Sequence, residues 1–432
     1  MDVLMTKKAN KTTIEENIQK FTLSDEQAQA LELLDSGENI FLTGGAGCGK
    51  SHLIRAFMSR QSAKQMPILA STGAAAVLVG GRTFHSFFGL GIMEGGFEAT
   101  VTKATRERRV LKRISDVEGF ILDEVSMIPA EALEAAEQIA RVARGSSLPW
   151  GGLRVVLVGD FAQLPPVTRN GPRQWAFRSK VWEQSGLQTC WLTHNHRIDD
   201  RDFLDRLSEV RSGRVTPQVI EFLEDHVRDN DQDDKATRLF PLRDQSEKFN
   251  LSELAGLSTA EMVVDSIYFG EARYIEMLQK QSPIPARLTL KEGCRVLFLQ
   301  NDPQRRWVNG TRGVVTEIQP DKIVVEKLSQ GGLRGREVTV EKTMFSLQNA
   351  EGDVVASVLN FPLTLAYATT IHKSQGSTLD ELWVDLSRLW EPGHAYVALS
   401  RLRSAHGLRI LRWSQKSFVV DPLVNQFYEQ FY

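Results

Sequence analysis

One run of residues has the types and spacing of a phosphate-binding loop. Residues 40–52 read IFLTGGAGCGKSH, in which an apolar strand leads into the pattern G-x-x-x-x-G-K-[ST] and then into a helix. Glycine lets backbone N–H groups approach phosphate oxygens, and the positive end of the helix dipole faces the same anion. We therefore expect Lys50 to reach the outer phosphates of a nucleoside triphosphate and Ser51 to offer its hydroxyl to Mg²⁺. A glycine-rich turn that binds no nucleotide is the alternative, and the intact Gly-Lys-Ser ending argues against it.

Later segments carry side chains that suit phosphoryl transfer. An apolar run ends in Asp123 and Glu124, which suit a Mg²⁺ ligand and a base that activates water. The next apolar run leads to Gln163, whose amide can hydrogen-bond a γ-phosphate, although a polar turn explains the same residues equally well. Arg197 and Arg401 are candidates for neutralising transition-state charge, whereas either arginine alone is more often a surface residue.

The elements that must position these residues alternate between strands and helices. Ser24 and Gln27 form a capping-box pattern, which predicts the start of a helix. Buried apolar runs that alternate with helices are typical of a parallel sheet covered on both faces, so the predicted fold class is α/β. The predicted strands are 39–42, 67–72, 119–127, 154–161, 382–386 and 408–412, and helices are predicted at 130–144 and from the start of 73–81.

Two segments depart from this alternation. From about residue 285, short β-like runs are separated by Asn-Gly, Pro-Asp and Gly-Gly turns, which predicts a small inserted antiparallel barrel of about 70 residues. Residues 1–20 are polar, and we expect them to form a loose N-terminal arm.

The composition is that of a globular protein. The 432 residues are 42% hydrophobic and 25% charged, and no apolar stretch approaches the length of a membrane span, so no membrane partner is expected. The net charge of −2 does not favour nucleic-acid binding, although the stretch TKATRERRVLKR is locally basic. A solvated helix face is the favoured interpretation of that stretch taken alone.

The three cysteines are widely spaced and odd in number, which excludes a disulfide framework and favours a reducing cytoplasm. Cys48 lies inside the phosphate-binding loop, at the N-terminus of the predicted helix. Such a position can lower the pKa of a thiol. We therefore expect alkylation of Cys48 to inhibit the protein and ATP to protect it.

The motifs taken together resemble those of one family. GGAGCGKS, STGAAA, GRTFHSFFGLG, ILDEVSM, PWGGLRVVLVGDFAQLPPV, LTHNHR, RLFPLR, WVNGTRG, ATTIHKSQGST and YVALSR follow one another in this order. This series resembles Pif-family DNA helicases, in the RecD-like branch of helicase superfamily one, over about residues 21–412. The long terminal extensions of eukaryotic relatives are not seen, which suggests a bacterial or phage minimal form. Cys48 stands where threonine is more usual, a change that should not abolish ATP binding.

The resemblance implies two RecA-like domains with ATP between them, a small wedge and an inserted β-barrel. By position, it implies the following ranges: an arm at 1–20, a first RecA-like domain at 21–190 with the wedge at about 84–118, a second RecA-like domain at 191–285 and 358–432, and the barrel at 286–357. It implies an ATP-dependent enzyme that moves 5′ to 3′ on single-stranded DNA and unwinds duplex or structured DNA. A translocase that unwinds little has the same motifs, and a nucleotide-dependent binding switch is a more distant alternative.

The resemblance also assigns roles to single residues. In ATP hydrolysis it implies Lys50, the base Glu124, the sensor Gln163 and the arginine fingers Arg197 and Arg401, with Ser51 and Asp123 as the Mg²⁺ ligands. The implied ATP-binding set is Gln27, which would read adenine, with Gly45, Gly47, Cys48, Gly49, Lys50, Ser51, His52 and Gly376. The implied DNA-binding set is Thr72, His85, Ser86, Phe87, Pro165, Thr370, His372 and Lys373, with plain core packing as an even alternative for Phe87.

The family further implies partners and a place of action. Single-stranded DNA and tailed, forked or G-rich structured DNA are the expected partners, with roles in DNA repair, recombination and telomere maintenance across the family. Because both arginines come from one chain, we expect a monomer. The expected location is the cytoplasm, at the nucleoid if the cell is bacterial.

Overall fold

The computed structural model describes residues 22–61, 65–72, 82–91, 93, 95–167, 173–229, 236–282, 284–304, 306–307, 309–328, 334–348 and 354–431. The arm predicted at 1–20 and the helix predicted from 73–81 lie outside the described residues. The chain divides into two compact units. Unit 1 is Met1–Phe161 with Pro165–His196, and unit 2 is Ala162–Leu164 with Arg197–Tyr432.

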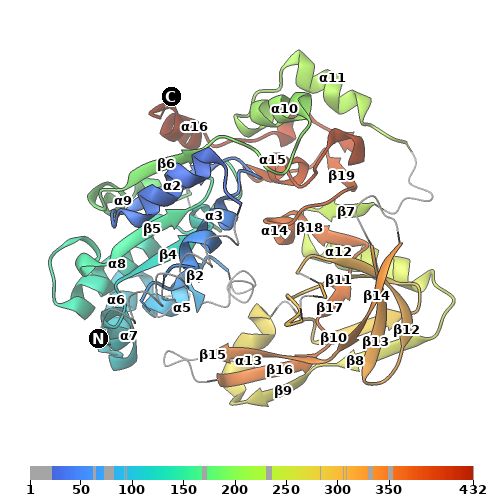
Figure 1. The fold of residues 1–432 in the computed structure, drawn as a ribbon, viewed down its shortest axis with the longest axis horizontal. Helices are drawn as coiled ribbons and strands as arrows, with labels where there is room; N and C mark the ends of the chain where they lie inside the picture. Colours follow the sequence, from blue (N-terminus) through green and yellow to red (C-terminus); the bar gives the residue numbers. More distant parts are fainter. Residues whose placement is uncertain are drawn as a thin grey trace, which may run out of the picture. The chain divides into compact units, whose positions relative to one another are not determined.

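Unit 1 is built around a six-stranded parallel sheet with the strand order β3-β2-β4-β5-β1-β6 (Figure 1). The strands are β1 (Ile40–Gly44), β2 (Ile68–Ala70), β3 (Arg82–Thr83), β4 (Gly119–Asp123), β5 (Arg154–Val158) and β6 (Gln188–Leu192). The helices are α2 (Asp25–Asp35), α3 (Lys50–Met58), α5 (Phe84–Phe88), α6 (Gly96–Arg106), α7 (Arg108–Ser115), α8 (Ala130–Arg144) and α9 (Lys180–Gln184), with 3₁₀ turns η1 (Val125–Met127), η2 (Pro149–Gly152) and η3 (Ala176–Arg178).

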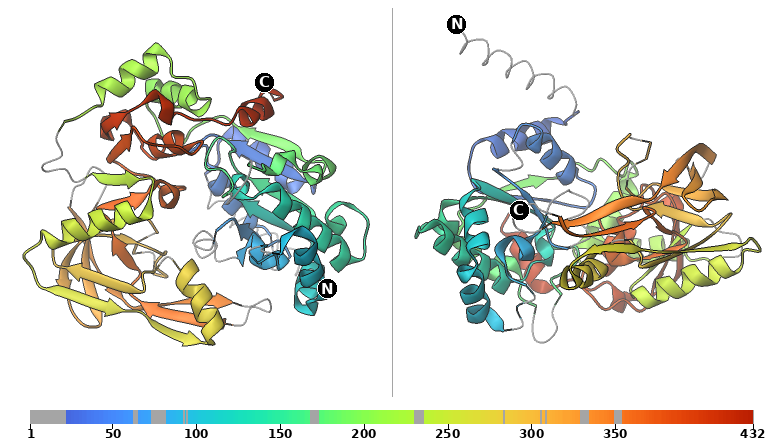
Figure 2. Two further views of the ribbon diagram at one scale, coloured as in Figure 1. Left: turned by 180° about the vertical axis from the view of Figure 1, so that it is seen from behind. Right: turned by 90° about the horizontal axis from the view of Figure 1, so that it is seen from below.

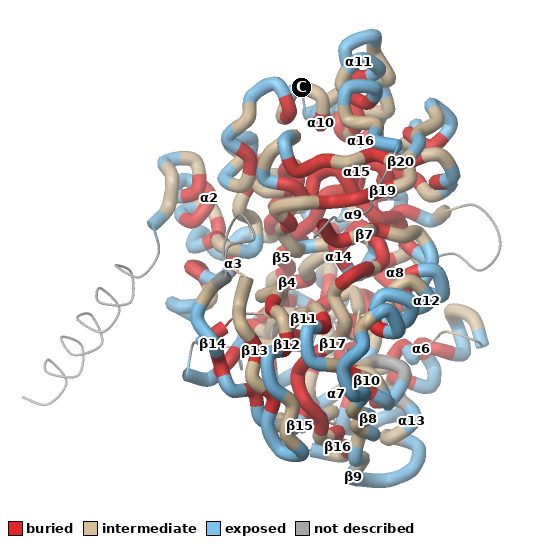
Figure 3. The backbone as a smooth tube through the Cα atoms, turned by 90° about the vertical axis from the view of Figure 1, so that its right-hand side faces the viewer, coloured by how far each residue is buried: buried red, intermediate tan, exposed pale blue. Residues whose placement is uncertain are grey.

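Helices cover both faces of this sheet. Apolar residues of α2 and α3 pack on one face, in a cluster with Ile40, Leu42, Ile121 and Val156 of β1, β4 and β5. The other face is aromatic: the ring of Phe41 meets that of Trp182 on α9, with centroids 4.9 Å apart. Burial on both faces explains why these strands read as continuous apolar runs, and Figure 3 shows the buried backbone of β4 and β5.

Local sequence signals set the helix ends in unit 1. The capping box predicted for α2 is confirmed, because Ser24 and Gln27 each bond the other's backbone N–H. The predicted helix 130–144 is confirmed as α8, which ends at Gly145 in the left-handed conformation.

Unit 2 contains a four-stranded parallel sheet with the order β18-β7-β19-β20. Its strands are β7 (Thr237–Phe240), β18 (Ala368–Thr370), β19 (Leu382–Leu386) and β20 (Leu408–Trp413), so the strands predicted at 382–386 and 408–412 are confirmed. The helices of the unit are α10 (Arg201–Arg211), α11 (Pro217–Asp225), α12 (Arg243–Ala255), α13 (Ala272–Gln281), α14 (Ile371–Ser374), α15 (His394–Leu399) and α16 (Pro422–Glu429), with 3₁₀ turns η5 (Ala405–Gly407) and η6 (Gln415–Ser417).

The remaining strands of unit 2 form antiparallel sheets (Figure 2). A five-stranded sheet has the order β14-β13-β12-β11-β17, a three-stranded sheet has the order β15-β16-β9, and β10 pairs with β8. The strands are β8 (Glu261–Asp265), β9 (Ile267–Gly270), β10 (Arg287–Lys291), β11 (Arg295–Phe298), β12 (Arg312–Ile318), β13 (Lys322–Leu328), β14 (Arg334–Glu341), β15 (Thr343–Gln348), β16 (Val354–Asn360) and β17 (Leu363–Leu365).

This antiparallel region differs from the predicted insertion 286–357 in extent. β8 and β9 lie within 191–285, yet they pair with β10 and β16, and β17 lies beyond residue 357. The sequence pattern does not identify these two strands, because neither has a buried face. β8 alternates exposed and half-buried residues, and β9 exposes Ile267 and Phe269. The barrel and the domain boundaries therefore stay predictions. Within the described part of the chain, no helix combines the length and apolarity needed to cross a membrane.

Candidate functional site

The phosphate-binding loop joins β1 to α3 in unit 1. Gly47 and Gly49 have φ of +89° and +81°, which side chains rarely adopt. A Cβ on Gly49 would lie 2.3 Å from Gln27 Nε2, so only glycine fits there. The Lys50 ammonium donates to the carbonyl oxygens of Gly44 (2.7 Å) and Gly45 (3.1 Å) and thus lies over the loop. A tight backbone cradle with a lysine above it fits a polyphosphate.

Gln27, which is predicted to read adenine, lies against this loop. It is 2% exposed, and its Oε1 accepts a hydrogen bond from the Ser24 N–H (3.2 Å). That bond fixes the amide so that Nε2 faces Gly49. One capping box therefore starts α2 and orients the side chain beside the loop. His52, also predicted to bind ATP, is half-buried, and its Nε2 lies 3.1 Å from the carbonyl oxygen of Thr22.

A segment far along the chain holds the loop from the other side. Asn195 donates from Nδ2 to the carbonyl of Ala46 (2.7 Å), and the N–H of His196 donates to the carbonyl of Gly47 (2.9 Å). We call residues 193–196 the clamp. The His196 ring also approaches Gly49, since its Cδ2 would lie 3.3 Å from a Cβ at that glycine. Gly49 is thus enclosed between Gln27 and the clamp.

Glu26 anchors the clamp to α2. Its carboxylate accepts from the Thr193 N–H (2.8 Å), the Thr193 hydroxyl (2.7 Å) and the His194 N–H (3.1 Å). Burial alone would raise the pKa of Glu26, but the hydrogen bonds from Thr193 and His194 outweigh it and lower that pKa. The carboxylate is therefore charged near neutral pH and ties α2, the clamp and the loop together.

Asp123 and Glu124 lie at the carboxyl end of β4, at the same sheet edge as the loop after β1. Burial raises the pKa of Asp123, against the opposing effects of the Glu124 N–H, which donates to its Oδ1 (2.9 Å), and of the Lys50 charge. A cation beside this carboxylate would favour its charged form. Glu124 has φ +54° and ψ +49°, a left-handed conformation that is strained for glutamate.

In unit 2, both candidate arginines meet at Ser400. Arg401 is 1% exposed and donates to the Ser400 hydroxyl (2.9 Å), to the carbonyl of Val397 (2.8 Å) and to the carbonyl of Ser374 at the end of α14 (3.4 Å). Arg197 donates to the carbonyl of Ser400 (2.8 Å). Residues from three distant segments of the chain are thus brought to one place, at the C-terminus of α15.

Gln163 lies in the same unit and is 4% exposed. Its Oε1 accepts a hydrogen bond from Gln375 Nε2 (3.4 Å), and Gln375 directly follows Ser374. The backbone of Gln163 touches Gly393, where a Cβ would lie 2.3 Å from the Gln163 carbonyl oxygen. Gly376, predicted to bind ATP, has φ +78°, and no described atom lies within 4 Å of where its Cβ would be.

The turn η2, which precedes β5 and belongs to the quoted motif PWGGLRVVLVGDFAQLPPV, has a structural role. Trp150 is fully buried in a left-handed conformation (φ +57°), its N–H donates to the buried Glu137 carboxylate (3.0 Å) and its Nε1 to the Ser185 hydroxyl (2.8 Å). Glu137 also accepts from Arg141. A Cβ on Gly151 would lie 2.7 Å from the carbonyl oxygen of Ala140, so the turn packs directly on α8. The stretch therefore locks α8 to the sheet.

Comparison with known proteins decides the family. Residues 22–219 match the model of the PIF1-like helicase family. The ATP-dependent DNA helicase Pif1 of Bdellovibrio bacteriovorus is 61% identical over 414 residues, which are 96% of this chain and 93% of that protein. This chain belongs to the PIF1-like helicase family. The predicted family is therefore confirmed.

Solved Pif1 structures share the fold. Bacteroides sp. Pif1 in complex with ADP-AlF4 aligns with 95% of this chain and 97% of that one, at 27% identity and a TM-score of 0.81. Bacteroides Pif1 in complex with ADP-AlF3 and ssDNA aligns over the same shares, at 26% identity and a TM-score of 0.67. The predicted α/β fold class with two RecA-like parallel-sheet domains is thereby confirmed.

The PIF1-like motif around α5 gives one correction. Phe87 is 2% exposed, and its ring packs against Phe88 (5.0 Å between centroids), so it does not offer a face for stacking bases. The prediction that Phe87 contacts DNA is wrong for its side chain, because the aromatic core takes the ring. Ser86 is exposed and His85 is half-buried, and burial lowers the pKa of His85, so its imidazole is neutral near pH 7.

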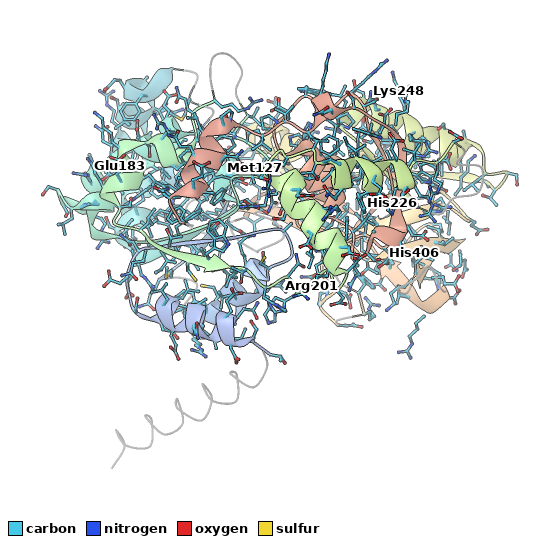
Figure 4. The ribbon with its side chains drawn as sticks, turned by 90° about the horizontal axis from the view of Figure 1, so that it is seen from above. Met127, Glu183, Arg201, His226, Lys248 and His406 are labelled. Carbon is cyan, nitrogen blue, oxygen red and sulfur yellow. The ribbon has the colours of Figure 1, made fainter. Side chains whose placement is uncertain are left out.

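The other predicted DNA-contact residues lie in two places. In unit 1, Thr72 follows β2 and is half-buried. The neighbouring Ser71 hydroxyl donates to Sδ of Met127, labelled in Figure 4, at 3.6 Å, which joins the end of β2 to the turn η1. Pro165 is buried. In unit 2, Thr370 caps α14 by accepting from the Lys373 N–H (3.1 Å), which leaves His372 and Lys373 exposed on that short helix.

The structure corrects the expectation for Cys48. Its side chain is 3% exposed, in the apolar cluster of α2, α3 and β1, with Sγ 3.9 Å from the carbonyl oxygen of Thr193. Alkylation requires an exposed thiolate, so rapid modification is not expected.

Sequence reasoning missed the residues that support the site. These are Glu26, Thr193, Asn195 and His196 around the loop, and Gln375 and Ser400 around the arginines. The sequence signal that could have found them is their position, since each lies next to a predicted site residue or within one of the quoted motifs.

Proposed function

We propose that this protein is an ATP-dependent DNA helicase that moves 5′ to 3′ along single-stranded DNA and separates duplex or structured DNA. The observation that carries the proposal is an intact phosphate-binding loop, held by Gln27 and the clamp, in a chain 61% identical to a named ATP-dependent DNA helicase. The relative solved with ADP-AlF3 and ssDNA supports both ligands for the family fold.

Unit 1 supplies the groups for binding and attack. Lys50, which already lies over the loop, would turn from the carbonyls of Gly44 and Gly45 to the outer phosphates of ATP. Ser51 and Asp123 would hold Mg²⁺, which would supply positive charge to the phosphates. Glu124 would accept the proton of the attacking water. Its strained backbone supports a role in which the carboxylate is held in one place.

Unit 2 supplies the groups proposed to stabilise charge. Arg197 and Arg401 would neutralise charge that develops on the transferred phosphoryl group, and Gln163 would report the γ-phosphate. Arg401 donates to the carbonyl of Ser374, the last residue of α14, and the side chain of the next residue, Gln375, donates to Gln163. A change at either bond would reach α14, which carries the exposed His372 and Lys373 proposed to grip DNA phosphates.

The remaining assignments complete the proposal. The helices between residues 84 and 118 would act as the wedge, and the antiparallel region of unit 2 as the inserted barrel. Because all proposed groups come from one chain, a single copy would suffice for ATP hydrolysis. Since the relatives are DNA helicases, the protein would act where the DNA lies, in the cytoplasm and at the nucleoid of a bacterium.

Strand displacement on two tailed duplexes tests the function. One duplex carries only a 5′ single-stranded tail and the other only a 3′ tail, and both are offered with ATP and Mg²⁺. Unwinding of the 5′-tailed duplex alone is expected. Unwinding from the 3′ tail would overturn the polarity, and ATP hydrolysis stimulated by DNA without unwinding of either duplex would replace the helicase by a single-strand translocase.

Two substitutions test the site. Lys50→Ala and Glu124→Gln are each expected to abolish ATP turnover while the thermal unfolding midpoint changes little. Glu124→Gln should still bind ATP, because it keeps the loop and removes only the proton acceptor. Retained turnover in either purified variant would refute the assignment of that residue.

A further inference from the structure

The helical pair α6–α7 is rich in basic side chains. Between Gly96 and Ser115 the chain has six cationic side chains and two anionic ones, although the whole protein has a net charge of −2. α6 buries Thr100, Val101 and Ala104, and α7 buries Val110 and Ile114. The cations fall on the remaining faces. We call the exposed side chains of Lys103, Arg106, Arg108 and Lys112 the basic face.

The cations of the basic face lack neutralising partners within the described residues. None of the four forms a salt bridge there, and Glu98 and Glu107, which line a shallow groove with Lys103 and Arg106, lie too far from both for an ion pair. In unit 2, by contrast, the exposed Arg243 pairs with Glu247 and the exposed Arg287 with Asp265. A protein with more acidic than basic residues thus has four neighbouring cations that form no salt bridge within the described residues.

Arg108 has an unfavourable position on α7, whereas Lys112 lies in the last turn, where the helix dipole favours a cation. Arg108 and Arg109 occupy the first turn, where the helix dipole presents its positive end, and the N-cap Glu107 makes no side-chain cap. Cations at a helix N-terminus cost stability, because the helix dipole presents its positive end there. Local folding therefore does not explain Arg108, and removing its charge should not unfold the helix. The other three cations of the basic face lie in the last turns of α6 and α7, where the helix dipole favours them.

The basic face is joined rigidly to α5. Arg113 on α7 donates to the carbonyls of Phe87 (2.9 Å) and Ser86 (3.1 Å), and its guanidinium lies 5.4 Å from the Phe87 ring centroid. A Cβ on Gly89, which ends α5, would lie 3.0 Å from Val110 Cγ2. α5, with His85 and Ser86, thus moves together with α7.

The basic face suits a ligand that presents many phosphates while its bases are paired and stacked inside a duplex. Proteins that bind single strands combine cations with aromatic side chains on which bases stack. α7 has no aromatic residue and α6 has one, Phe97, which is half-buried. The cations lie about one helical turn, or about 5–6 Å, apart, and a duplex carries about one phosphate charge per 1.7 Å of axis, so each cation can find a phosphate.

We propose that the basic face binds the phosphate backbone of double-stranded DNA. The assignment rests on the proposed function, because a helicase that moves on one strand meets the duplex in front of it. The face would hold that duplex through charge alone, without reading its sequence. Arg113 would keep the duplex in a fixed position relative to α5.

The test compares two double variants of the full chain. Arg108→Gln with Lys112→Gln removes two charges from one side of α7, and Arg178→Gln with Lys180→Gln removes two exposed charges elsewhere in unit 1 as the control. Binding of a blunt-ended duplex is measured by fluorescence anisotropy between about 50 and about 200 mM salt. The α7 variant should weaken binding about 60-fold at about 0.1 M salt and reduce the slope of log affinity against log salt by about 1.8, since each phosphate contact contributes about 0.9. The control should change neither value.

Separate readouts keep the inference distinct from the proposed function. ATP hydrolysis stimulated by a single-stranded oligonucleotide should be the same in wild type and in the α7 variant. Arg108→Lys with Lys112→Arg, which keeps both charges, should restore duplex affinity. Unchanged duplex affinity in the α7 variant, or an equal loss of duplex and single-strand affinity, would overturn the proposal. Wild-type protein without DNA-stimulated hydrolysis would instead refute the proposed function.

Discussion

Replacement of Glu26 tests whether the clamp sets the affinity for ATP. Its carboxylate accepts three hydrogen bonds from Thr193 and His194, at 2.7–3.1 Å. Hydrogen bonds to a charged group contribute about 1.5–3 kcal/mol each, but the donors are exposed and water would replace part of them. We therefore expect Glu26→Ala to loosen the clamp by about 1–3 kcal/mol in total. Asn195 and His196 would then hold the loop less firmly.

The assay is steady-state ATP hydrolysis with single-stranded DNA in excess. A loss of about 1–3 kcal/mol in the bound state corresponds to a rise of about 5-fold to about 150-fold in the Michaelis constant for ATP. The turnover number should fall much less, because Lys50 and Glu124 are untouched. Asp25→Ala is the matched control, since Asp25 is an exposed carboxylate in the same helical turn. An unchanged Michaelis constant in Glu26→Ala would refute the role of the clamp.

The pH dependence gives a second check on Glu26. Its pKa is lower in the folded protein than in the unfolded chain, so its contribution is complete above the unfolded value. The contribution is lost as the pH falls through the folded value. The Michaelis constant of the wild type should therefore rise at acid pH, and that of Glu26→Gln should already be raised at neutral pH.

Three further substitutions have defined outcomes. Gln375→Ala removes the hydrogen bond to Gln163 and should lower DNA-stimulated ATP hydrolysis about 2- to 12-fold, from a bond of about 0.5–1.5 kcal/mol, with little change in the unfolding midpoint; full activity would contradict this. Gly151→Ala should lower the unfolding midpoint by several degrees, because its Cβ meets the Ala140 carbonyl at 2.7 Å; Gly145→Ala, with a similar φ and open space, should cost less. Asp302→Asn should lower the free energy of unfolding by about 1–3 kcal/mol, because the buried carboxylate bonds Arg306. The hydrogen bonds from Arg306 lower the pKa of Asp302, so the wild type should lose this extra stability as the pH falls through the pKa of Asp302 in the folded protein. Equal free energies of unfolding for the wild type and Asp302→Asn near neutral pH would refute the contribution.

Local patterns explain the parts of the fold that were predicted correctly. The Ser24–Gln27 capping box, the glycine-rich loop and the α8 range all depend on residues a few positions apart. Such signals act at short range, and the order of the motifs along the chain carried the family resemblance.

Features that depend on distant contacts could not be predicted from one sequence. Glu26 and Thr193 are 167 positions apart, and no local pattern couples them. The family resemblance implies DNA contact for Phe87, but its ring is buried and packs against Phe88, whose ring in turn meets that of Phe120. In β9, the exposed Ile267 and Phe269 remove the apolar–polar contrast that identifies a strand.

The placement of Gln163 has a consequence for synthesis of the chain. Residues 162–164 belong to unit 2, and the Gln163 backbone packs against Gly393. Gly393 is translated about 230 residues later, which takes about 10–50 s at typical rates of elongation. The segment that carries Gln163 must therefore wait, outside its final contacts, until most of the protein has left the ribosome. A nascent chain would thus acquire its phosphate-binding loop early and its Gln163 contacts almost last.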